Sequence, residues 1–319
     1  MVYSWKKIFI VLLEEAECAF CNKDILVNKI VQKIHPSEKR GGFFMKMFKE
    51  EDQRQILLAC GILLMMGWFS FTTMQMSGVV ADSEITRQRV PVLMYHHILP
   101  QEEIKGLFAD NNIVVSLEQF QSDMQTLKNN GYQTISLRQL NDFVRNGAEV
   151  PPKSVVVTFD DGYLSNKIYA MPVLQKLNYT AAIFTLTGWM EEKPQPFDSE
   201  KLQYLSWEEI RQMGHTFQFA SHTDNLHSLS WNGTGKLLTE SSLAKTEDLR
   251  RSLRKLHGTT YFSYPYGHYS KEVQQILEQQ GIELAFTVNP VSVCAGDNPL
   301  ELGRWDMYQY TIEEVLKSN

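Results

Sequence analysis

The chain has 319 residues, of which 43% are hydrophobic and 21% are charged, enough for one large single-core domain or two smaller ones. The formal net charge is −6; the first 89 residues hold 12 Lys/Arg and 10 Asp/Glu, so residues 90–319 hold 19 basic and 27 acidic residues, a net charge of −8. This acidic balance argues against a nucleic-acid partner and favours a neutral or cationic ligand.

Cysteines give little structural information. Three of the four, Cys18, Cys21 and Cys60, precede residue 90, and only Cys294 follows it, so we expect no disulfide framework in the second part of the chain. Cys18 and Cys21 have the spacing of a metal or redox pair. No second pair follows and no βαβ pattern surrounds them, which disfavours such a role.

An uncharged run at 56–76 is long enough to cross a bilayer as one helix. Basic residues lie closer to its N-terminal side, which favours a cytoplasmic N-terminus and an extracellular domain. We therefore expect a cytoplasmic tail or a mis-assigned N-terminal extension over 1–55, a transmembrane signal anchor over 56–76, a linker over 77–90 and a globular domain over 91–319. Cleavage near Ala81 is the alternative and would give a secreted protein.

From Pro91 onward, short apolar strands alternate with amphipathic helices. Capping patterns at Ser116 and Ser206 mark helix starts, and 241–257 is a long helix. The expected strands are Val92–Tyr95, Thr134–Leu137, Val155–Phe159, Ala181–Leu186, Thr216–Ala220, Thr260–Ser263 and Leu284–Thr287. Alternating βα units predict an α/β fold with a parallel sheet, most simply a distorted (β/α) barrel, with a doubly wound open sheet as the alternative.

Polar side chains follow the ends of four of these strands. They are His96 and His97 after the first, Asp160 and Asp161 after the third, the segment Ser221–His227, and the segment Tyr264–His268. Because the carboxyl ends of parallel strands meet at one edge of a sheet, these groups could converge.

Two histidines and a carboxylate from this set could form an open, three-ligand metal site, the arrangement of catalytic zinc. His222 and His227 are five residues apart, a spacing that suits a turn better than one helix face. Each part alone has a simpler explanation, since an H-x4-H pair is often a solvated loop and Asp-Asp-Gly is a common turn. Their combination favours the metal site.

Three segments in order, Thr158–Tyr163, Ser221–His227 and Tyr264–Gly267, resemble the first three motifs of the polysaccharide deacetylases (NodB-homology, carbohydrate esterase family 4). The resemblance covers roughly Pro91 to Leu316. The segment Pro91–Ile98 is similar to the poly-β-1,6-N-acetylglucosamine N-deacetylase branch, in which the motif with the acid histidine stands near the start of the domain.

The resemblance implies a NodB-type barrel of seven strands and a divalent metal, Zn²⁺ with Co²⁺ or Ni²⁺ as alternatives. Asp161, His222 and His227 would hold the metal. Asp160 would be the general base that takes a proton from the attacking water.

The resemblance also implies the remaining catalytic groups. His96 would protonate the departing amine, with His97 as the competitor for this role. The Pro265–Tyr266 loop would contact substrate, and the backbone N–H of Tyr266 would stabilise the oxyanion.

One position departs from the family pattern. Many members carry an Arg in the third motif that pairs with the base, whereas the matching residue here is Ser263. Arg304 is the candidate to orient Asp160; a salt bridge with Asp306 or another acid is the alternative.

The sequence thus predicts metal-dependent hydrolytic N-deacetylation of an extracellular N-acetylglucosamine polymer, with poly-β-1,6-N-acetylglucosamine, a biofilm polysaccharide, as the leading substrate. Alternatives are a peptidoglycan or chitin-oligomer deacetylase, a xylan O-acetyl esterase, or a non-catalytic glycan-binding barrel. A metalloprotease is disfavoured because no H-E-x-x-H motif occurs. Three tryptophans could line a sugar-binding groove or simply pack in the core or rim: Trp189, Trp207 and Trp231.

Overall fold

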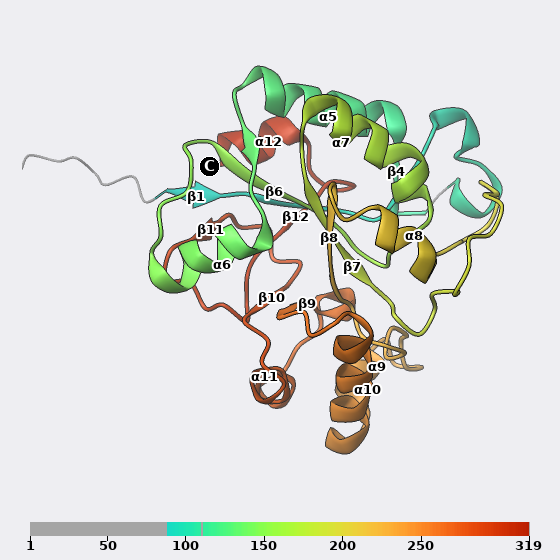
Figure 1. Ribbon diagram of the computed structural model, residues 1–319, viewed down its shortest axis with the longest axis vertical. Coiled ribbons are helices and arrows are strands. Elements are labelled where there is room, and N and C mark those ends of the chain that lie inside the picture. The colour runs from blue at the N-terminus through green and yellow to red at the C-terminus, as the bar shows by residue number, and fades with distance from the viewer. Residues whose placement is uncertain (1–87, 110, 319) are drawn as a thin grey trace, which may run out of the picture. The chain divides into compact units, whose positions relative to one another are not determined.

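The computed structural model describes residues 88–109 and 111–318, where strands and helices alternate (Figure 1). The strands are β1 (Arg89–Val90), β2 (Val92–Tyr95), β3 (His97–Leu99), β4 (Val114–Ser116), β5 (Gln133–Thr134), β6 (Ser154–Phe159), β7 (Ala181–Thr185), β8 (Phe217–Ser221), β9 (Tyr261–Ser263), β10 (Leu284–Phe286), β11 (Val293–Cys294) and β12 (Trp305–Asp306). The α-helices are α5 (Leu117–Asn129), α6 (Leu137–Asn146), α7 (Met171–Leu177), α8 (Trp207–Gln212), α9 (Lys236–Thr239), α10 (Ser242–Lys255), α11 (Lys271–Gln279) and α12 (Ile312–Lys317). A π-helix spans Asn166–Ala170, and 3-10 turns span Gln101–Glu103, Gly106–Phe108 and Pro265–Gly267.

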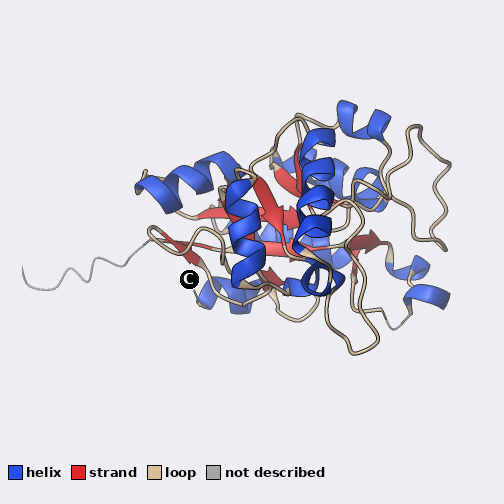
Figure 2. Ribbon diagram, turned by 90° about the horizontal axis from the view of Figure 1, so that it is seen from below, coloured by secondary structure: helices blue, strands red, loops and turns tan. Residues whose placement is uncertain are grey.

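One parallel sheet organises the fold. Its strands follow the order β10-β9-β8-β7-β6-β2-β12, and β5 pairs with β6 outside this path. The two edge regions approach each other, because Leu302, just before β12, forms a parallel bridge to Phe286 of β10. The N–H of Thr287 donates to the Leu302 carbonyl at 2.8 Å. The sheet is therefore curled rather than flat, with helices around it (Figure 2).

Strand β6 lies inside this sheet and is buried along its whole length. Its side chains alternate between two apolar clusters, as strand geometry requires. Val155, Val157 and Phe159 pack in the cluster that includes residues of α5 and α7, whereas Val156 packs in the cluster on the other face. Burial on both faces explains why the strand is continuously apolar instead of alternating with polar residues.

Side chains cap the helices that follow the strands. Ser206 and Glu209 form a full capping box at the start of α8, and Ser116 accepts from the N–H of Gln119 at the start of α5. Gly147 ends α6 in the left-handed conformation that glycine adopts most easily. The helix starts predicted at Ser116 and Ser206 are therefore confirmed.

The predicted fold class is corrected on two points. In the described residues the paired strands form a curled half-barrel, consistent with a (β/α) barrel of the NodB type, but with eight strands instead of the seven expected. The second point concerns the predicted transmembrane helix. Within 88–109 and 111–318, no helix is both long and apolar enough to cross a membrane. The expected anchor at 56–76 and tail at 1–55 lie outside the described residues, and the domain boundary at 91 stays a prediction.

Candidate metal centre and catalytic site

The two adjacent aspartates lie where β6 ends. The N–H of Asp160 still donates to the carbonyl of Tyr95 at 2.9 Å, so the carboxyl ends of β6 and β2 lie side by side. The chain then turns through Asp161, which has φ 68°, and Gly162, which has φ 77°. A Cβ on Gly162 would lie 3.0 Å from Cγ2 of Thr185 on β7. This tight turn keeps both carboxylates buried at the edge of the sheet.

Asp161, His222 and His227 come together in one cluster. Oδ1 of Asp161 lies 3.3 Å from Nε2 of His227 and 3.6 Å from Nε2 of His222. One potential ligand atom from each residue lies within 4.8 Å of the other two. Oδ1 of Asp161 is buried and has no hydrogen-bond partner in the protein. An unpartnered buried carboxylate oxygen is costly, and a cation bound at this point would remove that cost.

His222 is held in the tautomer that a metal ligand needs. Its Nδ1 lies 2.8 Å from the carbonyl oxygen of Ser263, which can only accept, so Nδ1 carries the proton. Nε2, which faces Asp161, is then free to donate its lone pair. Burial lowers the pKa of His222 from 6.5 to about 4, despite the opposing effect of Asp160. His222 is thus neutral near pH 7.

Aromatic rings enclose the second histidine. The Tyr266 ring stacks on His227 with ring centroids 4.5 Å apart, and Trp189 contacts His227 edge-on at 6.0 Å. Two imidazoles and one carboxylate suit a divalent transition metal, and three protein ligands leave a position for water or substrate. The donor set therefore fits the metal implied by the sequence.

Asp160 is held by Arg304. The guanidinium donates two hydrogen bonds of 2.7 Å, one to each carboxylate oxygen. Ser263 adds a bond of 3.1 Å from its hydroxyl to Asp160, and it accepts one of 2.9 Å from Arg304. Burial has the largest single effect and would raise the pKa of Asp160, but Arg304, His222 and His96 together outweigh it and hold the pKa well below its usual range. Asp160 is therefore ionised at neutral pH.

Arg304 is fully buried, so its placement depends on several distant elements. Its Nε donates to the carbonyl of Thr287 at 2.9 Å, and the guanidinium lies over the rings of Phe184 and Phe286 at 5.6 and 6.0 Å. Arg304 lies just before β12 in the segment that joins the two edges of the sheet. Ser263, which stands where many family members carry the arginine, thus hydrogen-bonds to both Asp160 and Arg304.

His96 and His97 lie in different surroundings. His97 is 1% exposed, its Nδ1 lies 2.6 Å from the Ser165 hydroxyl, and its ring packs on Phe108 and Tyr163. Burial lowers the pKa of His97 to about 4. His96 is partly exposed, and a positive charge on it would lower the pKa of Asp160, so the two lie within electrostatic reach.

The Tyr264–His268 segment lies against the histidines. Tyr266 has φ 58°, which is unusual for a bulky residue, and its side chain is 39% exposed. The preceding Pro265 is buried, and a Cβ on Gly267 would lie 2.5 Å from Val288. The tight packing of this turn fixes the backbone of Tyr266 beside His227.

The three candidate tryptophans have different positions. Trp189 is 37% exposed and next to His227, Trp207 begins α8, and Trp231 is 98% exposed. Tyr204, which no sequence motif indicated, contacts Trp189 at 5.3 Å and stacks on Tyr163 at 5.3 Å. It is brought to the site by an isolated bridge with Tyr163, a contact without a local sequence signal.

Comparison with known proteins gives a consistent result. Residues 147–285 match the family described as polysaccharide deacetylase. YxkH of Bacillus subtilis (strain 168) is 29% identical over 203 residues, which are 63% of this chain and 65% of that protein, so the match spans a little less than two thirds of YxkH. The poly-β-1,6-N-acetyl-D-glucosamine N-deacetylase of Staphylococcus aureus (strain MSSA476) is 27% identical over 215 residues, 65% of this chain and 72% of that protein.

Among solved structures, IcaB from Ammonifex degensii is similar, with a TM-score of 0.61 and 27% identity. The alignment covers 71% of this chain and 97% of IcaB. The resemblance predicted from the three sequence motifs is therefore confirmed at the level of the family.

Proposed function

We propose that this chain, whose residues 147–285 match the polysaccharide deacetylase family, is a divalent-metal-dependent hydrolase that removes N-acetyl groups from an N-acetylglucosamine polymer. The observation that supports this proposal most is the cluster of Asp161, His222 and His227 beside a second, ionised carboxylate, Asp160. Asp161 lies near the histidines and has one oxygen without a hydrogen-bond partner, whereas both carboxylate oxygens of Asp160 accept hydrogen bonds from Arg304. This division supports separate roles for the two acids.

Asp160 would accept the proton of the attacking water. Because Arg304 lowers its pKa, Asp160 is always ionised near pH 7 but is a weak base. A divalent metal, when bound by Asp161, His222 and His227, would supply the missing driving force by acidifying the water and polarising the acetamide carbonyl. The low pKa of Asp160 and the metal requirement are thus linked in this proposal.

His96 would protonate the departing amine. It follows β2 directly, is partly exposed, and lies within electrostatic reach of Asp160. His97 is a poor alternative because it is buried between Phe108 and Tyr163. The Pro265–Tyr266 turn would contact the acetyl group, with the N–H of Tyr266 directed at the developing oxyanion.

Poly-β-1,6-N-acetylglucosamine is the polymer we propose first, because the relatives from Staphylococcus aureus are named for it. Deacetylation would leave free amines, and a cationic product suits a region of net charge −8. The metal proposed is Zn²⁺, with Co²⁺ or Ni²⁺ as alternatives, since two imidazoles and a carboxylate bind all three. An extracellular place of action follows from this substrate and stays a prediction.

The test is acetate and free-amine release by the full chain from poly-β-1,6-N-acetylglucosamine, chitin oligomers, peptidoglycan and acetylated xylan, each with Zn²⁺, Co²⁺ or Ni²⁺. We expect the fastest release from the β-1,6-linked polymer. Faster release from another substrate would replace the proposed polymer and keep the chemistry. No release from any substrate, by protein that binds metal, would overturn the proposal.

A further inference from the structure

The loop that carries both histidines has a strained backbone. Between His222 and His227 the chain passes through Thr223, which has φ 81°, a left-handed value that is rare for a β-branched residue. Such a conformation costs on the order of 1–3 kcal/mol and persists only where the surroundings impose it. Within the loop, the N–H of Leu226 donates to the Thr223 hydroxyl at 3.2 Å. The separation of the two imidazoles depends in addition on contacts from outside the loop.

Those contacts come from Asp248 in the middle of α10. Its Oδ1 accepts the backbone N–H of Asp224 at 2.8 Å, and its Oδ2 accepts that of Asn225 at 2.8 Å. Arg251, one turn further along α10, lies 3.4 Å from the same Oδ2. The Asp248 side chain is 1% exposed, so water cannot take over these bonds if the carboxylate is lost.

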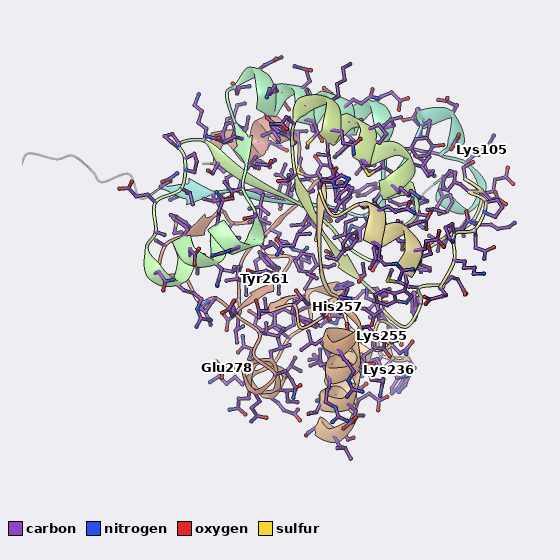
Figure 3. The ribbon with its side chains drawn as sticks, in the orientation of Figure 1. Lys105, Lys236, Lys255, His257, Tyr261 and Glu278 are labelled. Atoms are coloured by element: carbon purple, nitrogen blue, oxygen red, sulfur yellow. The ribbon has the colours of Figure 1, made fainter. Side chains whose placement is uncertain are left out.

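A second set of contacts holds the side chain and the carbonyl of Asp224, partly from α10 and partly from the segment after β7. Its carboxylate accepts from the Thr187 hydroxyl at 2.7 Å and from Nζ of Lys255 at 2.7 Å. The carbonyl of Asp224 accepts from the N–H of Gly188 at 2.9 Å, and a Cβ on Gly188 would lie 2.5 Å from that carbonyl oxygen. The end of α10 that carries Lys255 lies next to the sheet (Figure 3). The loop is thus fixed between α10 and the segment after β7.

We propose that Asp248 is a positioning residue for the metal site: it fixes the backbone at 224–225 and so sets the separation of His222 and His227 before the metal binds. The inference rests on the metal site of the proposed function but not on its substrate. Groups that hydrogen-bond directly to metal ligands commonly contribute about 10- to 100-fold to metal affinity. Asp248 acts one step further out, through the backbone between the two histidines.

The first experiment is titration of metal-free protein with Zn²⁺ and with Co²⁺, using the full chain and the variant Asp248→Asn. The amide is nearly isosteric but can accept only one of the two backbone N–H groups. We expect the Kd for both ions to rise by about 10-fold, the lower end of the range for direct partners of metal ligands, with a changed Co²⁺ absorption spectrum. A Kd within twofold of the parent, in a folded variant, would overturn the proposal.

A matched control is Glu209→Gln. Glu209 is also a buried carboxylate that accepts a backbone N–H, that of Ser206 at 2.9 Å, and it pairs with Lys167 at 3.1 Å. It belongs to α8, and neither Ser206 nor Lys167 lies in the loop that carries His222 and His227. We expect Glu209→Gln to lower stability and leave the metal Kd unchanged. An equal loss of affinity in both variants would count against a specific role of Asp248.

A second measurement uses the unaltered chain and does not depend on whether the variant folds. Hydrogen exchange in the metal-free protein should show protected amides at Asp224 and Asn225, because Asp248 accepts from both without the metal. Protection that develops only after metal is added would refute a preset loop. Neither experiment needs turnover, so a chain that binds metal but hydrolyses no polymer would contradict the proposed function and leave this inference standing.

Discussion

Replacing Arg304 with Met would leave the buried carboxylate of Asp160 without its cation. Arg304 makes two bonds of 2.7 Å to Asp160, and the side chains of Arg304 and Asp160 are only 0% and 4% exposed. Removing one partner of such a buried pair costs about 3–5 kcal/mol, because an uncompensated charge remains inside the protein. We expect the free energy of unfolding of Arg304→Met to fall by this amount at pH 7.

The dependence of this loss on pH follows from the pKa of Asp160. In the parent the folded pKa lies below the unfolded value of 3.8, so the pair stabilises the fold above that value and loses its effect as pH falls through the folded pKa. Without Arg304, burial raises the folded pKa above the unfolded one. Protonation of Asp160 would then remove the uncompensated charge in Arg304→Met. The difference in free energy of unfolding between the variant and the parent should therefore shrink as pH falls toward about 4.

The pH dependence of activity should change for the same reason. A higher pKa of Asp160 moves the acid limb of kcat/KM to higher pH in Arg304→Met. Urea unfolding from pH 4 to 7 and deacetylation over the same range measure both effects. The double variant Asp160→Asn, Arg304→Met should recover part of the stability, because it removes the charge as well as its partner.

A surface arginine provides the control. Arg250 on α10 pairs with Glu247 and is about half exposed, so Arg250→Met should change stability by less than about 1 kcal/mol. If Arg304→Met were destabilised no more than Arg250→Met, with an unmoved acid limb, the assignment of Arg304 as the group that holds Asp160 would be wrong.

Three further predictions concern the neighbouring groups. Asp160→Asn should lower kcat/KM by about 10²- to 10⁴-fold and leave the metal Kd unchanged in a titration; loss of both would contradict the division of roles between the two aspartates. His96→Ala should lower kcat with little change in KM, whereas His97→Phe should keep kcat; the reverse pattern would move the acid role to His97. Because the folded pKa of His97 is about 4 and its unfolded value is 6.5, the unfolded chain binds the proton first, and stability should fall from about pH 6.5 toward pH 4, by up to about 1.4 kcal/mol per unit. Urea unfolding of the metal-free protein, repeated between pH 4 and pH 6.5, should show that the free energy of unfolding depends less steeply on pH in His97→Phe than in the parent. An identical pH dependence in the two proteins would refute this.

The predicted anchor at 56–76 rests on length and apolarity alone, and it lies outside the residues that the structure describes. The strand and helix pattern predicted after residue 91 is largely confirmed, because it combined periodicity with capping residues.

The sequence by itself determined the features encoded over a few residues. The β-branched run of β6 predicted a strand buried on both faces, and the polar groups at strand ends identified Asp160, Asp161, His222 and His227 as neighbours. This inference works because parallel strands all present their carboxyl ends at one edge. The order of the three motifs was enough to indicate the family.

Only the tertiary structure decided which groups each of these residues contacts. Arg304 reaches Asp160 across 144 residues of sequence because the segment before β12 lies between β10 and β2. Asp248 reaches the histidine loop from a helix whose own pattern shows only an amphipathic surface. Periodicity fixes the face on which a side chain stands, whereas its partner depends on how the sheet curls and where each helix packs.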